Sequence, residues 1–503
     1  MSTSFDILGA LAELRHYAAN ARTRGLSDDT LLALAPQHPE LVTAVKAAQQ
    51  AFATVRIEFA DLLALDENAQ AAQVQASFVN FYAADAVNPY VALAACGPWV
   101  VTLKGAVVHD SGGYGMLGFG HTPASVLEAL ARPQVMANIM TPSLSQLRLS
   151  RALQAEIGRR GQGCPFSHFM CLNSGSESVT LACRIVDVNA KLQTEPGARH
   201  AGKTIKHVAV KGAFHGRTEG PARYSDSTRK AYLAHLASYR GDASLLTVDP
   251  YDVAQLRELF AQADREGWFI EAMFLEPVMG EGDPGRGVTP EFYAAARELT
   301  QAHGGLLLVD SIQAGLRAHG VLSVIDYPGF EKLAPPDMET YSKALNAGQY
   351  PLSVLAVREP IAALYRTGVY GNTMTTNPRA MDVACAVLES LTPAIRSNIV
   401  ARGREFVQKL DALRMELPGL ITKVQGTGLL FSCELAADTF KCYGTDSIEE
   451  YLRENGIGVI HGGANSLRFT PHFGITEDEV DLVVGHVRQA LLKGPRKLAK
   501  EAA

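Results

Sequence analysis

The chain has 503 residues, of which 47% are hydrophobic and 19% charged, and its formal net charge is −6. This composition is typical of a soluble globular protein with two or more domains, and the acidic balance argues against nucleic acid or an anionic membrane as the main partner. No apolar run is long enough to span a bilayer and the first residues form no export signal, so we expect a cytoplasmic protein.

Changes in composition and hydrophobic pattern along the chain predict four regions. Residues 1–87 are rich in Ala, Leu and Gln and predict a helical N-terminal extension, with a long helix over residues 42–65. Residues 88–125 contain short strand patterns and are expected to form the N-terminal part of a small domain. Residues 126–376 are expected to form the large domain, and residues 377–503 a C-terminal small domain of α+β type.

Helices alternate with short apolar strands in the large domain. The candidate strands are residues 169–172, 207–210, 245–248, 272–275, 306–309 and 352–357. A helical pattern from Pro290 to His303 lies between two of them. Such alternation predicts an α/β fold with a mainly parallel sheet and helices on both faces.

The seven cysteines are scattered through the chain. They lack the spacing of a zinc site and mostly lie in apolar contexts, which indicates free thiols in a reducing compartment. The sequence therefore predicts no metal site.

Asp310 and Lys343 indicate a particular chemistry. Asp310 ends the apolar strand 306–309, and α/β sheets bind their ligands at the carboxyl ends of such strands. Lys343 lies further on among small residues and could return to the same crevice. A carboxylate facing a ring nitrogen and an imine-forming lysine are the groups that pyridoxal phosphate (PLP) needs from a protein. The alternatives are a helix-capping Asp and a solvated surface lysine.

A phosphate seat is predicted between the strand 169–172 and the following helix. Backbone N–H groups at a helix start bind phosphate, Gly175 allows close approach, and Ser174 and Ser176 add hydroxyl groups. The alternative for this segment is a plain serine N-cap.

Phe214 and His215 follow the strand 207–210 and are counted among the cofactor-binding candidates. The ring of Phe214 could stack on a flat heteroaromatic ring at the end of the strand. The alternative is a turn with one buried aromatic residue.

Three further residues complete the candidate site. Gln313 follows Asp310 closely and could bond the 3-oxygen of the cofactor ring. Thr373 could add a phosphate donor, although an ordinary Asn-Pro turn also explains its segment. Arg468 lies in an otherwise apolar strand, where its guanidinium needs an anion: a substrate carboxylate or a structural ion-pair partner.

In this order, the motifs resemble class III aminotransferases of PLP fold type I, the group that contains ornithine, acetylornithine and 4-aminobutyrate aminotransferases. The resemblance covers residues 88–492 and rests on the segments 174–177, 214–218, 276–282, 310–313, 342–345, 373–378 and 467–471. It implies a large domain with a mainly parallel mixed sheet, flanked by helices, and a smaller α+β domain.

The resemblance also implies roles for the matching residues in holding PLP. Lys343 would bind the cofactor as a Schiff base, Asp310 would pair with the pyridinium, and Phe214 would stack on the ring. Gly175 and Ser176 would hold the phosphate.

Substrate binding and assembly follow from the same resemblance. Arg468 would hold the α-carboxylate of the substrate. Thr373 would contact the phosphate bound by the partner subunit, so a homodimer is the expected minimum unit, and a tetramer stays open.

Three features depart from the family pattern. Ser311 stands where the family usually has Glu after the ring Asp, and residues 317–320 replace a Gly-Arg-Thr-Gly segment, so that Arg317 is displaced. The extension before Asn88 is also longer than usual. The two substitutions concern the substrate pocket, not the cofactor.

We therefore predict a PLP-dependent aminotransferase that moves an amino group from an amino acid or related amine to an oxo acid, with 2-oxoglutarate suggested by family habit. A racemase, epimerase or aminomutase is the alternative, because such enzymes share this fold and its motifs, and only the site of proton return separates racemisation from transfer. A non-catalytic binding protein with a relict site is disfavoured, since Lys343 and Asp310 are both present.

Overall fold

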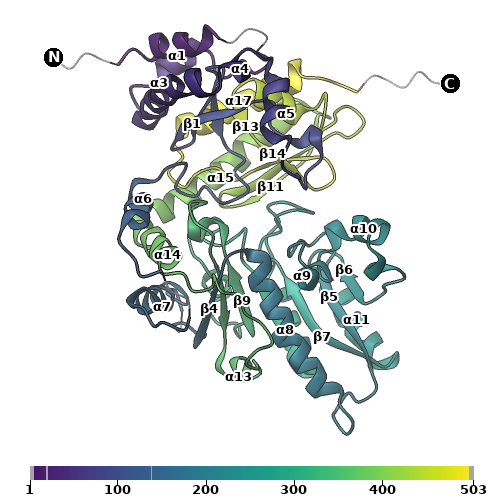
Figure 1. Cartoon of the computed structure of the whole chain (residues 1–503). Coiled ribbons are helices and arrows are strands. Elements are labelled where there is room, and N and C mark those ends of the chain that lie inside the picture. Colours follow the sequence, from purple (N-terminus) through teal and green to yellow (C-terminus); the bar gives the residue numbers. More distant parts are fainter. Residues whose placement is uncertain (1–4, 18–20, 137–138, 162, 498–503) are drawn as a thin grey trace. The chain divides into compact units, whose positions relative to one another are not determined.

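The chain forms two compact units, whose elements are labelled in Figure 1. The computed structural model describes residues 5–17, 21–136, 139–161 and 163–497. The terminal unit contains Met1–Pro123, Ala401–Gln425 and Phe431–Ala503, and the central unit contains Ala124–Val400 and Gly426–Leu430. Segments from both ends of the chain thus fold together into one unit.

The first part of the terminal unit is helical. Its helices are α1 (Ile7–Arg15), α2 (Asp28–Leu34), α3 (Pro39–Glu58), α4 (Ala60–Leu63) and α5 (Glu67–Gln75). The single helix expected over residues 42–65 is divided, because the backbone of Phe59 leaves the helical region with φ −134° and ψ 41°. The apolar pattern continues across the break because α4 still buries Leu62 and Leu63. The pattern thus indicated the buried face and not the helix end.

Two small sheets complete the terminal unit, apart from residues 426–430. One contains β1 (Ala92–Cys96), β2 (Trp99–Thr102), β3 (Val107–Asp110) and β13 (Ile457–Gly458), in that order. The other contains β11 (Ile421–Thr427), β12 (Leu430–Leu435), β15 (Ser466–Phe469) and β14 (Ile460–Gly462), in that order. Because β13 pairs with β3, a C-terminal strand completes a sheet begun near the N-terminus.

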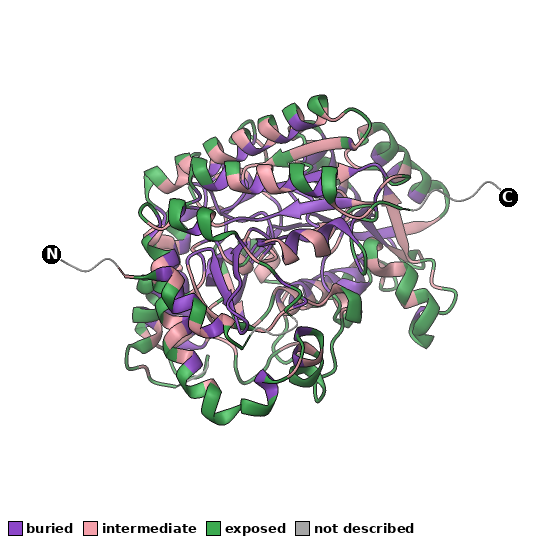
Figure 2. Ribbon diagram, turned by 90° about the horizontal axis from the view of Figure 1, so that it is seen from above, coloured by how far each residue is buried: buried purple, intermediate pink, exposed green. Residues whose placement is uncertain are grey.

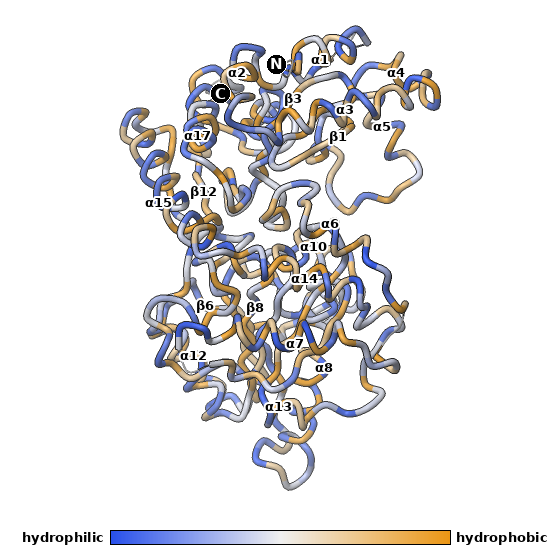
Figure 3. The backbone as a smooth tube through the Cα atoms, turned by 90° about the vertical axis from the view of Figure 1, so that its left-hand side faces the viewer, coloured by the Kyte–Doolittle hydropathy of each residue, from blue (hydrophilic) through white to orange (hydrophobic). Residues whose placement is uncertain are grey.

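Three helices accompany these sheets: α15 (Pro393–Glu416), α16 (Ile448–Glu454) and α17 (Glu477–Lys493). Figure 3 shows hydrophilic and hydrophobic residues alternating along α15. That alternation is typical of a helix with one buried and one solvated face.

The central unit is built on a seven-stranded sheet. In spatial order its strands are β4 (His168–Leu172), β10 (Ser353–Val357), β9 (Met338–Tyr341), β8 (Leu306–Asp310), β7 (Trp268–Leu275), β5 (Thr204–Val210) and β6 (Leu245–Val248). The strands from β9 to β6 run parallel, whereas β10 pairs antiparallel with β9 and β4. This mainly parallel mixed sheet confirms the predicted fold class. Only β9 was not predicted, because its Glu339 and Thr340 are polar although fully buried.

Helices cover both faces of this sheet. Leu307 and Val309 of β8 pack with residues of α11 (Val253–Arg265) and α12 (Pro290–His303). Leu306 and Leu308 pack on the opposite face with α8 (Gly175–Thr194), which lies across the strands in Figure 1. Figure 2 shows buried strands beneath helices with exposed outer faces. Burial on both faces explains why β8 is an unbroken apolar run.

The remaining elements connect these layers. They are α6 (Ala124–Ala131), α7 (Leu144–Glu156), α9 (Glu219–Ala222), α10 (Asp226–His235), α13 (Glu359–Ala362), α14 (Pro378–Ser390) and the 3₁₀ helices η1 (Ala84–Ala86), η2 (Ala237–Tyr239), η3 (Val324–Asp326) and η4 (Lys343–Asn346). Among the described residues, no single helix is long and apolar enough to cross a membrane, and α14 with α15 meets that criterion only as a bent pair.

Candidate active site

Two neighbouring parallel strands bring Asp310 and Lys343 to one edge of the central sheet. Asp310 is the last residue of β8 and stands in register with Thr340 of β9. Lys343 follows the end of β9 and begins η4. Because the carboxyl ends of parallel strands lie at the same edge, these residues lie at one edge of the sheet, and we call this edge with its loops the crevice.

Asp310 is buried, and both of its carboxylate oxygens have partners. Nδ1 of His215 lies 2.9 Å from Oδ2, and the N–H of Ile312 donates to Oδ1 over 3.1 Å. A buried anion needs such partners, and each carboxylate oxygen has a second lone pair for a further donor. His215 therefore orients the carboxylate that was predicted to face a cofactor ring.

A second buried carboxyl group, Glu276, ties two loops of the crevice together. Its Oε1 accepts from the N–H of Phe214 over 2.9 Å, and its Oε2 from the N–H of Gly280 over 2.8 Å. Burial raises the pKa of Glu276 to about 7, while His215 lowers it and Asp310 raises it further. In the sequence Glu276 is only part of a family pattern, and no local signal reveals that it fixes Phe214.

The phosphate seat was predicted at the N-terminus of α8, which the structure shows as a capped helix start. Ser174 is the N-cap, and its own N–H donates to Oε2 of Glu177 over 3.1 Å in a capping box. Ser174 thus has the capping role that was its alternative interpretation. The cap holds the amides of Gly175 and Ser176 at the positive end of a 20-residue helix, where an anion is favoured.

Glycines let three segments of the crevice approach closely. A Cβ on Gly175 would lie 2.6 Å from Cδ1 of Ile312, and a Cβ on Gly216 would lie 2.3 Å from Oγ of Ser176. The start of α8, the loop after β8 and the loop after β5 therefore meet where a larger residue does not fit. An anion seat beside a buried aspartate and a lysine is the arrangement that PLP requires, so these residues fit that cofactor.

The side chains of Phe214 and Gln313 have fixed neighbours in the same loops. The guanidinium of Arg217 lies 5.0 Å from the centre of the Phe214 ring. Nε2 of Gln313 donates to Oε1 of Glu281 over 3.2 Å. The stacking of Phe214 on a cofactor ring and the contact of Gln313 with a ring oxygen stay predictions.

Lys343 has an unusual backbone conformation. Its φ is 46°, in the left-handed region that side chains other than glycine rarely adopt. The flanking backbone is fixed by Oγ of Ser342 and Nδ2 of Asn346, which donate to the carbonyl of Leu352 over 2.7 and 2.9 Å. Such local strain persists where surrounding contacts over-determine it, and it is often found at functional sites.

Two predicted residues are not brought to this crevice by contacts within the central unit. Thr373 is exposed in the loop 371–377, where its neighbour Asn372 donates from Nδ2 to Oε1 of Glu177 over 3.4 Å. Arg468 lies on β15 of the terminal unit and is 1% exposed. Its guanidinium is 5.7 Å from the ring of Tyr114. The assignments of both residues rest on the resemblance.

Residues 81–491 match the model of the aminotransferase class-III family. The chain belongs to the class III aminotransferases. An acetylornithine aminotransferase from Xanthomonas axonopodis pv. citri is 30% identical over 319 residues, which is 63% of this chain and 72% of the relative. The acetylornithine aminotransferase of Mycobacterium leprae is 30% identical over 414 residues, 79% of this chain and 92% of the relative.

Solved structures share the fold of this class III aminotransferase. The ornithine aminotransferase of Toxoplasma gondii ME49 has a TM-score of 0.71 at 23% identity, covering 86% of this chain and 97% of that one. A transaminase from the marine bacterium Virgibacillus has a TM-score of 0.69 at 20% identity, covering 84% and 98%. Another structure of the T. gondii enzyme shows partial occupancy of PLP at its active site. PLP is the cofactor expected of class III aminotransferases.

The substitution at Ser311 has a structural counterpart in this aminotransferase. Oγ of Ser311 donates to Oε1 of Glu339 over 2.6 Å, and the N–H of Val324 donates to the same oxygen over 2.9 Å. Burial raises the pKa of Glu339 to about 7, although hydrogen bonds from Ser311 and Ser323 lower it. A carboxyl group thus lies beside the residue after Asp310, contributed by the neighbouring strand β9.

The displaced Arg317 has a structural contact within the central unit. It is fully buried, its Nη1 donates to the carbonyl of Leu429 over 3.2 Å, and the N–H of Leu429 donates back to the carbonyl of Arg317 over 3.0 Å. Burial lowers the pKa of Arg317 to about 9. Arg317 therefore holds the segment 426–430 against the rest of the central unit.

The terminal unit contains a buried charged cluster that the sequence did not suggest. Oε1 of Glu479 lies 3.2 Å from Nε2 of His109 and 3.2 Å from Nε2 of His472, and Oε2 accepts from the N–H of Thr476 over 2.7 Å. Burial alone would raise the pKa of Glu479, but the charge of His472 and the hydrogen bonds from both histidines hold it well below its usual range. The cluster ties β3 and α17 to the turn that follows Arg468.

Proposed function

We propose that this aminotransferase binds PLP in the crevice of the central unit and transfers an amino group from a carboxylate-bearing amino donor to an oxo acid. The observation that carries the proposal is the buried Asp310, oriented by His215, on the strand next to the one that leads to Lys343. These are the two protein groups on which PLP chemistry depends.

Residues of the crevice would hold the cofactor from several sides. When bound, PLP supplies a sink for the electrons released at the substrate carbon. Lys343 would hold it covalently through Nζ, and Asp310 would keep the ring nitrogen protonated, because a nearby negative charge raises the pKa of a cation. Phe214 would cover the ring face, and the amides of Gly175 and Ser176 would bind the phosphate.

Lys343 would also move the proton. Once the substrate amine had displaced it, Nζ would be free to take the proton from the substrate carbon and to return it on the cofactor side. One water molecule would then release the oxo product and complete the half-reaction. The bonds of Ser342 and Asn346 to Leu352 limit how far the lysine backbone moves during this step. Proton return to the substrate carbon instead would racemise the donor.

Arg468 would bind the carboxylate of the donor and of the acceptor. Its planar guanidinium matches a carboxylate with two parallel hydrogen bonds. Relatives named acetylornithine and ornithine aminotransferase support an amino donor with an α-carboxylate. We propose 2-oxoglutarate as the acceptor. A screen of amino donors, read by the change in cofactor absorbance, identifies the donor.

Replacing Lys343 with Ala tests the central assignment. The variant should lose the absorbance of lysine-bound cofactor and at least about a thousandfold of its turnover, because covalent attachment and proton transfer disappear together. Lys332→Ala removes an exposed lysine of the same unit and is the matched control. An active Lys343→Ala variant with an unchanged spectrum would refute the proposal.

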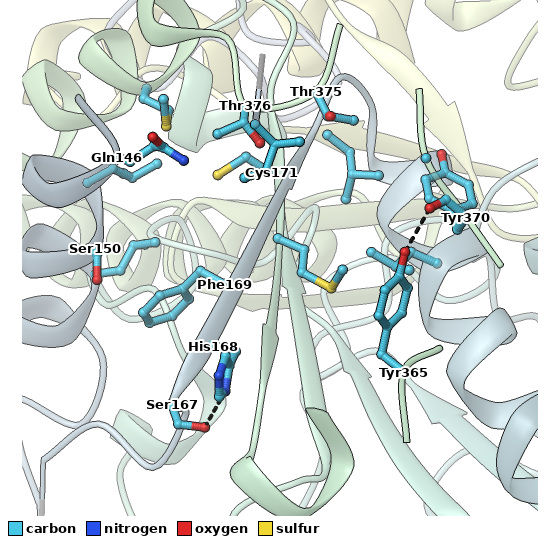
Figure 4. Close-up of a pocket in the computed structure, with 18 residues that line it drawn as sticks. Gln146, Ser150, Ser167, His168, Phe169, Cys171, Tyr365, Tyr370, Thr375 and Thr376 are labelled. Carbon is cyan, nitrogen blue, oxygen red and sulfur yellow. Dashed lines mark hydrogen bonds between the residues drawn. The ribbon is translucent and has the colours of Figure 1, made fainter. Parts of the chain in front are cut away.

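We further propose that the working form is a homodimer assembled along β4. This strand is the edge of the seven-stranded sheet, and a cavity of about 460 Å³ beside it is lined by Phe169, Met170, Tyr365 and other largely apolar side chains (Figure 4). Ile139 lines the cavity and is 60% exposed, and Leu144 of α7 is 69% exposed. Exposed apolar side chains near a sheet edge are typical of a protein interface.

Sedimentation velocity of a Leu144→Glu variant tests the dimer. A charge at a buried interface should shift the protein toward monomer and lower turnover, because Thr373 of the partner subunit would no longer complete the phosphate site. Leu192→Glu alters a comparably exposed leucine on α8, 50% exposed, and should leave the dimer intact. A Leu144→Glu variant that sediments as wild type would contradict this interface.

A further inference from the structure

One segment of the N-terminal extension runs between two fixed points of the terminal unit. We call residues 76–83, between α5 and η1, the strap. Before it, Oε2 of Glu67 accepts from the N–H groups of Arg22 and Thr23 over 2.9 and 2.7 Å. After it, Nη1 of Arg453 donates to the carbonyl of Ala86 over 3.0 Å. The elements on both sides of the strap, α5 and η1, are therefore held by buried or half-buried polar groups.

Among the bulky residues of the strap, Tyr82 alone is turned inward. Phe78, Val79 and Phe81 are 78%, 102% and 70% exposed, whereas Tyr82 is half-buried. The centre of the Tyr82 ring lies 5.7 Å from that of Tyr114 and 4.2 Å from that of Phe81. The strap thus presents one aromatic residue to the body of the unit.

Tyr114 in turn covers Arg468. The guanidinium carbon of Arg468 is 5.7 Å from the Tyr114 ring, within the range of a cation–π contact. Tyr114 has a φ of 52°, which is uncommon for tyrosine, so its placement is held by surrounding contacts. One such contact is the neighbouring N–H of Gly115, which donates to Oγ1 of Thr470 over 3.1 Å, just beyond the end of β15.

The two phenols behave as a pair. Burial raises the pKa of Tyr114 above its usual range, and the charge and hydrogen bond of Tyr82 raise it further. Both the ring contact and the hydroxyl of Tyr82 therefore act on Tyr114. With one face of the guanidinium covered by Tyr114, a carboxylate approaches Arg468 in the guanidinium plane, where the N–H donors lie.

We propose that Tyr82 is a positioning residue for carboxylate binding: it holds Tyr114 over Arg468, so that the strap tunes the affinity for the carboxylate of donor and acceptor. This inference rests on the proposed role of Arg468 and adds a residue of the extension to the site. Phe78, Val79 and Phe81, which are exposed on the same strap, offer matched positions for comparison.

Binding of glutarate to the full-length holoenzyme tests the inference without turnover. Calorimetric titration should show about fivefold to tenfold weaker binding for Tyr82→Ala, the loss expected when one desolvated cation–π contact is released. Tyr82→Phe keeps the ring and should retain most of the affinity. Val79→Ala, the control on the same strap, should bind as wild type, and the cofactor absorbance should be the same in all three variants.

A double-mutant cycle separates positioning from general damage to the strap. If Tyr82 acts through Tyr114, Tyr82→Ala adds no further loss in a Tyr114→Ala background. Two results would overturn the inference and leave the proposed function standing. One is that the losses of the two substitutions add. The other is that Tyr82→Ala binds glutarate within twofold of wild type while Arg468→Gln binds it weakly. If wild type does not bind glutarate, or Arg468→Gln binds it equally well, the carboxylate role of Arg468 fails as well.

Discussion

The crevice of the central unit and the surroundings of Arg468 in the terminal unit hold their charged groups by different means. Asp310 is fixed by a backbone N–H and by His215, both carried on loops at strand ends. Arg468 is covered by Tyr114, which touches Tyr82 of the strap. Tyr82 stands at the edge of the segment that matches the family. The group proposed to bind the cofactor is thus fixed within the central unit, whereas the arginine proposed to bind the substrate carboxylate is covered by a tyrosine that a residue of the strap contacts.

After Lys343→Ala, Asp310→Asn should have the largest effect on the cofactor side. The substitution keeps the shape of the side chain and an acceptor for His215 but removes the charge that would stabilise the ring proton. Turnover should fall by about a hundredfold or more, the size expected when one preorganised charge is removed from an active site. Single-turnover kinetics of the donor half-reaction measure the loss. The control is Asp249→Asn, which removes an exposed carboxylate paired with Lys211. Equal turnover rates for the two variants would show that the charge of Asp310 matters no more than a surface charge.

Glu479→Gln should mainly destabilise the terminal unit. It weakens the contacts with His109 and His472 and should lower the free energy of unfolding by about 2–3 kcal/mol at pH 7. Trp99 lies against His109, with ring centres 5.0 Å apart, so its fluorescence in a denaturant titration reports this unit.

The pH dependence of the Glu479 effect has a definite sign. Because the folded state lowers the pKa of Glu479, its stabilisation is present above the ordinary value of 4.5 and is lost as the pH falls below it. The gap between wild type and Glu479→Gln should therefore narrow below about pH 4.5. If the difference in unfolding free energy between the two proteins stayed constant down to pH 3, the charge of the Glu479 carboxylate would not be the source of the stabilisation.

Glu339→Gln should have a smaller effect of opposite sign on the central unit. Burial raises the pKa of Glu339 to about 7, so its protonated form is favoured in the folded state, and this contribution is lost as the pH rises from 4.5 through 7. Thermal unfolding across pH 5 to 8 should show wild type losing about 1–2 kcal/mol relative to the variant. Glu276 titrates in the same range in both proteins and cancels from the difference. Parallel stability curves would contradict the assignment to Glu339.

The smallest expected change is in the optical purity of an amino donor. One enantiomerically pure donor is incubated with the holoenzyme in the absence of an oxo acid. An aminotransferase should keep optical purity beyond a single half-reaction, whereas a racemase should lose it continuously. Chiral chromatography of the remaining donor measures this directly. Continuous loss would assign the Ser311 and Arg317 departures to a different reaction on the same cofactor.

Local patterns predicted most of the central sheet and the return of Lys343 to the edge where Asp310 lies, and the structure places the two residues at the ends of neighbouring strands. The apolar run before Asp310 is a strand buried on both faces, so composition alone indicated it. The strand β9 gave no such signal, because Glu339 and Thr340 are buried through polar contacts made by distant segments. The contacts of His215 with Asp310 and of Tyr82 with Tyr114 likewise join residues far apart in the chain, and neither has a local sequence signature.

The backbone of residue 343 has a consequence for engineering. Glycine adopts a φ of 46° without the strain that lysine bears there, so a Lys343→Gly chain should withstand denaturation better than the parent enzyme. The same change leaves a gap the size of an alkylamine, into which a small primary amine added to the solution could diffuse and restore part of the proton transfer. The polypeptide would then provide the stability, and the added amine would provide the proton transfer.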